Sequence, residues 1–526
     1  MSETFDAVFI GAGHNSLACA AHLATKGWSV GIFEQAPTAG GAVKTDEYTA
    51  PGFKSDWAAM NLSLFAGSPF FSAYKQDLLD CGLEFIPVKN CFSSAFPDGS
   101  WLGVTTDLSE TLSRISAFSP EDAKTWNSLV KEFPKESETL FSLLSCPINL
   151  NALACLLTKI VFRKGPSGTK ELFQFLLSSS RVWLDTTFQS EHLKATLAAW
   201  GMHLDFAPDI AGGALFPYLE AMANQSFGMV IGKGGAATLT NALTTMVQSR
   251  GGKIECNAPV LRIQRDNKGK ATAIELDNGR VITAKRAVIA NVAPGALIEK
   301  LLDRTSGHKK YDSKMRGFSH APGTMMIHLA VDNLPNWTAS PDLQKFAYVH
   351  LAPSMDQMAR TYQQAKAGLL PDEPVIVVGQ PTTVDPSRAP EGKHVLWIQV
   401  RMVPADIKGD AKGEITGRSW GETVTPYTKR VLDIIENYAP GFKASILHKR
   451  TVTPLELEQE NPNLVGGDQV CGSHHLHQHF LFRPAASHAS GETPVKNLHL
   501  IGAATWPGAG LGAGSGFALG QKLAGK

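Results

Sequence analysis

Paired cysteines are missing from this sequence. Its seven cysteines are scattered along 526 residues and show neither a Cys-x-x-Cys pair nor a metal-ligand spacing. A disulfide-built extracellular domain, a dithiol redox centre and a cysteine metal site are therefore disfavoured. With the first apolar run beginning at residue 5, no secretion signal is expected either. We expect a cytoplasmic protein with reduced thiols and no bound metal. The cysteines are Cys19, Cys81, Cys91, Cys146, Cys155, Cys256 and Cys471.

Long runs of one charge, long apolar runs and internal repeats are missing as well. The net charge is +1, so a nucleic acid is not expected as a partner. No uninterrupted apolar run reaches the roughly 18 residues that suggest a membrane span. A hydrophobic content of 43% and a charged content of 18% are globular values. The length is sufficient for about two domains.

The N-terminus carries a glycine turn between a strand and a helix. Residues 5–10 are apolar and predict a buried strand, and residues 11–16 form the turn. An Ala-rich helix over 17–26 and a second strand over 28–33 complete a β-α-β unit. In this context a glycine turn predicts a site for the pyrophosphate of a dinucleotide, at the positive end of the helix.

Individual residues of this unit have separate expected roles. Gly11 permits the tight turn, and Gly13 lets the backbone approach a pyrophosphate. Ser16 replaces the usual third glycine and is small enough for the helix to pack on the strand. Glu34 lies 23 residues after Gly11, where a carboxylate accepts ribose hydroxyls and repels a 2′-phosphate. FAD or NAD is therefore favoured over NADP.

Further glycines follow at 40–41 and again near the C-terminus. Gly40 and Gly41 remove side chains where the chain can pass a flat ring or a phosphate, although an ordinary loop also contains such residues. Lys44 either reaches the cofactor or is solvated. Near the C-terminus, residues 497–502 predict a strand, and a glycine-rich run then leads into a helix ending at residue 526.

The run 5–45 resembles the N-terminus of FAD-dependent oxidoreductases of the phytoene desaturase and amine oxidase superfamily. It is most similar to the phytoene dehydrogenase-like branch. The glycine turn at 228–243, the β-meander entered at 251–260 and the strand 287–291 are similar to the same family. So is the C-terminal segment from residue 497. The resemblance therefore covers both ends and the middle of the chain.

The resemblance implies an α/β fold with a Rossmann-like FAD-binding domain of the glutathione reductase type. A mixed α+β substrate domain is inserted into it. The implied FAD-binding segments are 1–55, 226–300 and 491–526. The implied substrate-domain segments are 56–225, mainly helical, and 301–490, a sheet with helices. In the second of these, strands are expected at 324–331, 374–378, 395–400 and 476–482.

FAD is the expected cofactor, and no metal is expected. His14 and Asn15 are expected to set the turn geometry and to hydrogen-bond FAD, and Val260 to contact adenine through its backbone. The expected FAD-binding residues are Gly11, Ala12, Gly13, His14, Asn15, Ser16, Glu34, Gln35, Gly40, Gly41, Ala42, Val260, Gly502, Ala503, Gly512 and Ala513.

The implied activity is hydride transfer at a C–C bond of a hydrophobic carotenoid, terpenoid, retinoid or lipid-like substrate. Two alternatives stay open: amine oxidation at a C–N bond, and a non-catalytic FAD-binding scaffold. The glycines at 232–235 are not followed by an acid-ended strand like that at Glu34, so no separate nicotinamide domain is expected. Electrons are then expected to pass to oxygen or a quinone.

An apolar stretch at 150–162, followed by Arg163 and Lys164, has two interpretations. It is either a buried helix of the substrate domain or a helix that lies in a membrane interface. The second interpretation makes the protein peripheral to a membrane. The sequence leaves the oligomeric state open.

Histidines cluster at His474, His475, His477 and His479. If 476–482 is a strand, alternation places His475, His477 and His479 on one face. That face predicts a polar wall of the substrate cavity, with His475 and His477 as candidates for proton transfer. Three ligands on one strand rarely form a zinc site, so metal binding is disfavoured. Surface or structural histidines are the remaining interpretation.

Overall fold

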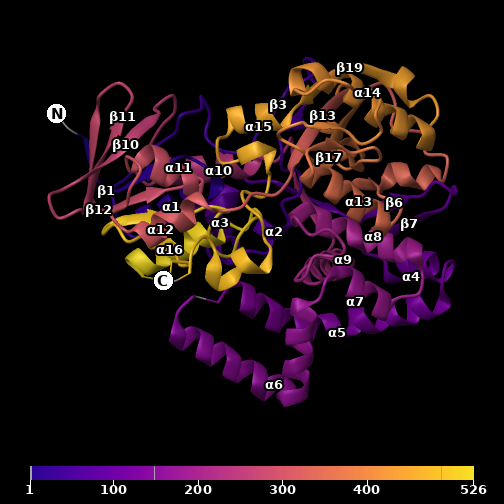
Figure 1. Cartoon of the computed structure of the whole chain (residues 1–526), viewed down its shortest axis with the longest axis horizontal. Coiled ribbons are helices and arrows are strands. Elements are labelled where there is room, and N and C mark those ends of the chain that lie inside the picture. Colours follow the sequence, from indigo (N-terminus) through magenta and orange to yellow (C-terminus); the bar gives the residue numbers. More distant parts are fainter. Residues whose placement is uncertain (1–2, 147, 487, 526) are drawn as a thin grey trace.

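A computed structural model describes residues 3–146, 148–486 and 488–525. One seven-stranded sheet contains the N-terminal β-α-β unit, at the left of Figure 1. Its order is β10-β11-β12-β1-β2-β9, with β20 also paired to β12. The pairs β12–β1, β1–β2, β2–β9 and β12–β20 are parallel, and β10–β11–β12 is an antiparallel meander. The strands are β1 (Glu3–Ile10), β2 (Val30–Phe33), β9 (Lys253–Glu255), β10 (Val260–Arg265), β11 (Ala271–Leu276), β12 (Val281–Ala290) and β20 (Leu498–Leu500).

Helices from distant parts of the chain pack on this sheet. α1 (His14–Thr25) contacts both α10 (Ala237–Ser249) and α16 (Gly514–Ala524), and α3 (Pro69–Asp80) also packs against α10. The contact between α1 and α16 is very close, because a Cβ on Gly516 would lie 2.0 Å from the backbone oxygen of Asn15. Glycine at 516 therefore allows the first turns of two helices to meet.

A second seven-stranded sheet has the order β19-β13-β17-β16-β14-β6-β7. The strands expected at 324–331, 374–378 and 395–400 are found here as β13, β16 and β17. The strands are β6 (Asn90–Ala95), β7 (Trp101–Thr105), β13 (Gly323–Val331), β14 (Tyr348–Leu351), β16 (Val375–Gly379), β17 (His394–Val403) and β19 (Ile446–Val452). β6 and β7 come from the segment expected to be mainly helical, and they extend the sheet at one edge.

The strand expected at 476–482 is wrong. Two short 3-10 helices, Leu476–Gln478 and Phe480–Phe482, occupy this range. Side chains support the backbone here in place of a strand ladder. The Gln478 amide donates to the backbone oxygens of Ser319 and Ser473, and its Oε1 accepts from the Ser319 N–H.

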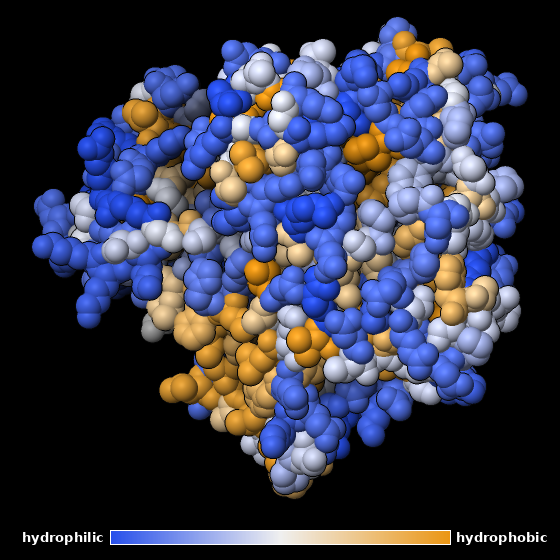
Figure 2. All heavy atoms as spheres, turned by 45° about the vertical axis from the view of Figure 1, so that its right-hand side comes forward, coloured by the Kyte–Doolittle hydropathy of each residue, from blue (hydrophilic) through white to orange (hydrophobic). Residues whose placement is uncertain are grey.

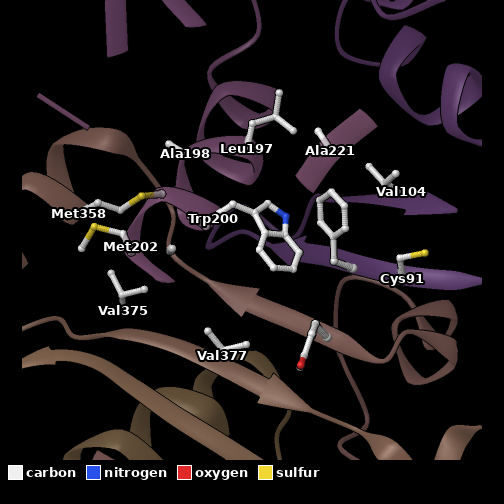
Figure 3. Close-up of a cluster of buried hydrophobic side chains, with 14 of the residues drawn as sticks. Cys91, Val104, Leu197, Ala198, Trp200, Met202, Ala221, Met358, Val375 and Val377 are labelled. Atoms are coloured by element: carbon white, nitrogen blue, oxygen red, sulfur yellow. The ribbon is translucent and has the colours of Figure 1, made fainter. Parts of the chain in front are cut away.

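Helices cover one face of the second sheet. They are α4 (Leu108–Ser116), α5 (Pro120–Leu144), α6 (Leu150–Leu177), α7 (Ser180–Thr187), α8 (Glu191–Gly201), α9 (Leu215–Phe227), α13 (Met355–Lys366) and, on the other side, α14 (Trp420–Tyr438). Figure 3 shows the core between them: Trp200 of α8 lies between Leu197 of the same helix and Val377 of β16. Buried apolar side chains thus fix the helices on the sheet.

Short elements complete the fold and join the two sheets. At the junction, Arg388 is fully buried and pairs with Asp56 and Asp385, while its Nη2 donates to the Gly232 oxygen. The remaining strands are β3 (Thr45–Asp46), β4 (Ser55–Asp56), β5 (Phe85–Val88), β8 (Met229–Gly232), β15 (Leu369–Leu370) and β18 (Gly409–Asp410). The remaining α-helices are α2 (Ser63–Ala66), α11 (Pro294–Ala296), α12 (Lys309–Arg316) and α15 (Pro454–Glu460).

Candidate cofactor site

The predicted phosphate turn lies between the end of β1 and the start of α1. Gly11 has a φ of +89°, and a Cβ on it would lie 3.3 Å from the Asn291 backbone oxygen. A Cβ on Gly13 would lie 3.0 Å from Asn291 Nδ2. Ser16 is fully buried, and its Oγ accepts from the same Nδ2 at 3.1 Å. The small residues therefore let the turn close over Asn291, at the end of β12, with the helix N-terminus facing the turn.

The second glycine turn packs directly on the first. Gly40 donates its N–H to the Ala12 oxygen at 3.0 Å, and a Cβ on Gly41 would lie 3.3 Å from the Gly13 Cα. Gly502, with a φ of +112°, approaches from the C-terminal segment. A Cβ on it would lie 2.3 Å from Asn291 Oδ1. Three glycine turns from distant parts of the chain thus meet around one asparagine.

Glu34 follows β2 and is buried at the opposite end of the turn. Its Oε2 accepts from the Ala12 N–H at 2.7 Å, and its Oε1 accepts from the Ala36 N–H at 2.9 Å. The carboxylate therefore holds the glycine turn in place while it lines the cavity beside it.

Asn15 joins the first turn of α1 to the first turn of α16. Its Oδ1 accepts from Ser515 Oγ at 2.9 Å and from the Gly516 N–H at 3.2 Å. Ser515 Oγ in turn accepts from the Gly502 N–H. Beside it, burial lowers the pKa of His14 to about 4, so this imidazole is neutral at pH 7. Asn15 therefore sets the turn geometry as expected, and two helix N-termini converge on the cavity.

A cavity of about 210 Å³ runs along these turns. Most of the expected FAD-binding residues line it: Gly11, Gly13, His14, Asn15, Glu34, Gln35, Gly40, Gly41, Ala42, Val260, Gly502 and Ala503. Ala12, Ser16, Gly512 and Ala513 lie behind the lining. Ala12 and Ser16 are held by Glu34 and Asn291, and Ala513 precedes the first residue of α16. The glycine turns leave room where Cβ atoms would obstruct a cofactor, so these residues suit a dinucleotide.

Several lining residues were not among those expected. Asn291, Asn461, Asn463 and Cys471 all face the cavity, and so does Lys44. Asn463 is tied to Asn291, because its Nδ2 donates to the Asn291 oxygen at 2.9 Å. Asn291 ends the apolar strand that the sequence predicted at 287–291, and this position was the available signal for it. For the loop 461–471 the sequence offered none.

The histidines do not share one face. His477 is exposed, whereas His474 is buried and its Nε2 accepts from the Ala509 N–H at 2.9 Å. Burial and the neighbouring Arg483 hold the pKa of His474 well below its ordinary value, as an accepting imidazole requires. His479 lies against the Trp506 ring. The expected alternation is wrong because 476–482 is not a strand. Among the described residues, no cluster suited to a metal ion is found.

His475 lies beside a buried acid. Its Nε2 is 2.8 Å from the Asp205 backbone oxygen and 3.3 Å from Asp205 Oδ2. Because a carbonyl oxygen only accepts, Nε2 carries the proton and Nδ1 is the accepting nitrogen. Tyr362 donates its hydroxyl to Asp205 Oδ1 at 3.0 Å, and burial raises the pKa of Asp205. The imidazole is thus fixed in one tautomer.

Arg483 holds this segment to the C-terminal glycine run. Its guanidinium is fully buried and donates to the backbone oxygens of Ala503, Ser473 and Gly472. Burial lowers the pKa of Arg483 to about 10, and the side chain remains charged at pH 7. The positive charge lies directly behind Ala503, which lines the cavity.

The family model for flavin-containing amine oxidoreductases matches residues 17–512. The chain belongs to this family. The resemblance to the phytoene desaturase and amine oxidase superfamily is thereby confirmed, and so is the α/β fold with a Rossmann-like cofactor domain. A flavin is the cofactor of this family, and an oxidoreductase enzyme is its usual member.

Curated relatives cover nearly the whole chain. A pyridine nucleotide-disulfide oxidoreductase domain-containing protein 2 of Rattus norvegicus is 28% identical over 97% of this chain and 92% of its own. A limonene dehydrogenase polypeptide of Castellaniella defragrans is 24% identical over 99% and 94%. A zeta-carotene-forming phytoene desaturase of Myxococcus xanthus is 26% identical over 96% and 90%.

Solved structures share the fold at lower identity. An oxidoreductase from Methanosarcina mazei superposes with a TM-score of 0.62 at 18% identity, covering 98% of both chains. A putrescine oxidase variant superposes with a TM-score of 0.60 at 16% identity, covering 100% of this chain and 98% of its own. These likenesses concern the fold alone.

Proposed function

We propose that the protein is an FAD-dependent oxidoreductase that acts at a C–C bond of a hydrophobic substrate. The observation that carries this proposal is the single cavity that joins Glu34 and Val260 to Gly502 and Ala503. A carboxylate after β2 suits the ribose of an adenosine, and the paired helix N-termini suit a pyrophosphate. A cavity with both suits a flavin dinucleotide better than a mononucleotide.

The chain's own groups would bind and align the cofactor. When bound, the flavin supplies hydride acceptance at its ring. The N-terminus of α16 and the charge of Arg483 lie at the end of the cavity lined by Ala503. Both favour negative charge at that end, which supports placing the ring there.

A C–C bond is favoured over a C–N bond by the sequence relatives. The full-length relatives named as dehydrogenase or desaturase take limonene or phytoene, both hydrocarbons. Putrescine oxidase is similar in fold alone, at 16% identity. We therefore propose a carotenoid, terpenoid, retinoid or other lipid-like substrate, with oxygen or a quinone receiving the electrons.

Desaturation of a C–C bond removes a hydride and a proton. The hydride passes to the flavin, and the proton needs an acceptor. We propose His475 for this role, because the carbonyl of Asp205 fixes its tautomer and leaves Nδ1 to accept. His477, the other histidine named from the sequence, is exposed and serves as the matched control.

Replacement of His475 by Gln should slow anaerobic flavin reduction about 100-fold, the usual contribution of a positioned base. His477→Gln should leave the rate unchanged. Both variants should keep their FAD, because neither side chain lines the cavity. Stopped-flow absorbance of the flavin measures this rate. Equal rates for the two variants would remove His475 from the proposal.

Anaerobic flavin bleaching against a panel of substrates tests the proposal as a whole. The panel contains carotenoids, retinoids, terpenes, fatty acyl compounds and hydrophobic amines. We expect yellow protein that releases FAD on denaturation and is bleached by an extended apolar compound. Bleaching by small charged amines alone would instead support amine oxidation. Colourless protein that fails to take up FAD would contradict the enzyme assignment and leave a scaffold.

A further inference from the structure

One part of the surface is unusually apolar. Large hydrophobic side chains are exposed from the end of α5, along α6 and into α7; we call this the α6 surface. Leu150 is 86% exposed and Phe162 is 88% exposed, so neither is covered by a neighbour. Contiguous apolar surface of this kind usually marks a binding site. The members are Phe141, Leu150, Leu157, Val161, Phe162, Phe173, Leu177 and Val182.

The spacing shows that these side chains form one face of α6. Leu150, Leu157 and Val161 are separated by intervals of seven and four residues, so they lie on the same side of the helix. Ile160 and Leu172 of the same helix are buried. A helix that is apolar on its inner and outer sides usually belongs in the interior. The outer side of α6 therefore lacks a partner within the described chain.

The α6 surface occupies an edge of the molecule. Figure 1 places α6 at the lower edge, and Figure 2 shows hydrophobic residues gathered over the lower part of the molecule. The helix changes direction at Gly165, whose φ is +69°. Its first segment, residues 150–164, is about 22 Å long at the usual helical rise.

Basic residues accompany the apolar ones. Between residues 141 and 182 the only acidic residue is Glu171, whereas the whole chain has 49 basic and 48 acidic residues. The basic residues of this range are Lys159, Arg163, Lys164, Lys170 and Arg181.

Two of these lysines have free charges. Arg163 pairs with Glu138, Lys164 with Glu136 and Arg181 with Asp209. Lys159 and Lys170 are exposed and form no ion pair with any residue that the structure describes. The α6 surface thus combines apolar side chains with positive charge, which is the chemistry of a helix bound at an anionic lipid interface.

We propose that the α6 surface docks on an anionic lipid bilayer, with α6 in the plane of the headgroups. In the described part of the chain, no helix has the length and apolar content to cross a bilayer. Insertion of Leu150, Leu157 and Phe162 to the depth of the acyl boundary needs no such helix. The proposal concerns the surface and does not depend on the identity of the substrate.

A second copy of the chain fits this surface less well. A two-fold contact would place the same patch of each copy against the other. Lys159 and Lys170 would then face their own copies, and like charges would repel. An anionic bilayer compensates the same charges, so the charge pattern favours lipid.

Vesicle flotation of the full-length protein tests the proposal. The probes are vesicles of phosphatidylcholine alone and of phosphatidylcholine mixed with phosphatidylserine. The apolar variant is Leu157→Glu with Phe162→Glu, and the charge variant is Lys159→Glu with Lys170→Glu. The control is Leu447→Glu, which changes an exposed leucine of β19 outside the α6 surface. Bound flavin and thermal unfolding show whether each variant is folded.

Wild type and Leu447→Glu should float with the mixed vesicles, less so at high salt. The apolar variant should bind at least about tenfold more weakly, because two side chains no longer gain from burial. The charge variant should lose its preference for phosphatidylserine. The proposal is overturned if wild type floats with neither kind of vesicle, or if the folded apolar variant floats like the control. It is also overturned if the wild type is a lipid-independent dimer that the apolar variant dissociates.

Discussion

Asn291 is the residue around which the cofactor site is organised. Its backbone and side chain lie against Gly11, Gly13 and Gly502, and its Nδ2 donates to Ser16. Ser16 stands in the place of a third glycine, and its hydroxyl uses that position to accept a hydrogen bond. The turn is therefore held by polar contacts as well as by the absence of side chains.

Glu34 is the residue whose replacement tests the cofactor site most directly. Glu34→Arg removes the acceptor for the Ala12 N–H and for the proposed ribose, and it should weaken FAD binding by about 2–4 kcal/mol. Glu34→Gln keeps one accepting oxygen and should bind FAD with intermediate affinity. Fluorescence titration of the apoprotein measures both. Full FAD occupancy in a folded Glu34→Arg variant would show that the ribose lies elsewhere.

The sequence predicted the residues whose signals are local. Glu34 and the glycines of the first turn belong to one β-α-β unit, where spacing alone defines their roles. Asn291 and Arg483 carry no such signal. Asn291 bonds Ser16 across 275 positions of the chain, and Arg483 binds backbone oxygens, which any sequence supplies. Only the folded chain brings these partners together.

At the scale of elements, helix α9 contains a carboxyl group with an unusual pKa. Burial raises the pKa of Glu220 to about 7, and only the Asn224 amide donates to it, at 3.3 Å. In the unfolded chain this carboxyl ionises at its ordinary pKa of 4.5. The unfolded state therefore binds fewer protons as pH rises between these two values, and the stability gained from the neutral acid is lost.

Stability should accordingly fall by up to about 3 kcal/mol as pH rises from below 4.5 to above 7. Glu220→Gln should remove this part of the pH dependence. Glu132→Gln, on an exposed position of α5, is the control and should leave the profile unchanged. Urea unfolding across this pH range provides the measurement. A Glu220→Gln profile parallel to that of wild type would contradict the assignment.

Strands were predicted where apolar residues dominate and missed where turns carry the signal. β6 and β7 are joined through Asp98 and Gly99, a recognisable turn, but the surrounding helices led us to expect a helical segment. The apparent strand at 476–482 failed for the opposite reason. Its alternating pattern is real, yet Gln478 and Arg483 satisfy the local backbone, so no ladder forms.

At the scale of the whole molecule, the two sheets are joined at the 232–235 glycine run. β8 pairs antiparallel with β5, so this run does not follow a parallel strand of a dinucleotide fold. A Cβ on Gly232 would lie 2.3 Å from the Gly235 oxygen, and one on Gly235 would lie 2.2 Å from Thr45. These glycines allow close packing of the chain on itself, and they leave no open approach for a pyrophosphate.

Electron transfer from a nicotinamide should consequently be slow. The cavity along the first β-α-β unit is assigned to the flavin dinucleotide, and the second glycine run is filled by the protein's own atoms. Under anaerobic conditions, micromolar NADH or NADPH should therefore leave the visible absorbance of the bound flavin nearly unchanged. Dithionite should bleach the same sample and is the positive control. Admission of oxygen or a soluble quinone to the reduced protein should then restore the flavin spectrum, because the electrons must leave to a diffusing acceptor. Rapid bleaching by NADPH would mean that a nicotinamide reaches the ring without a domain of its own, and the direction of the reaction would have to be reversed to reduction of the substrate.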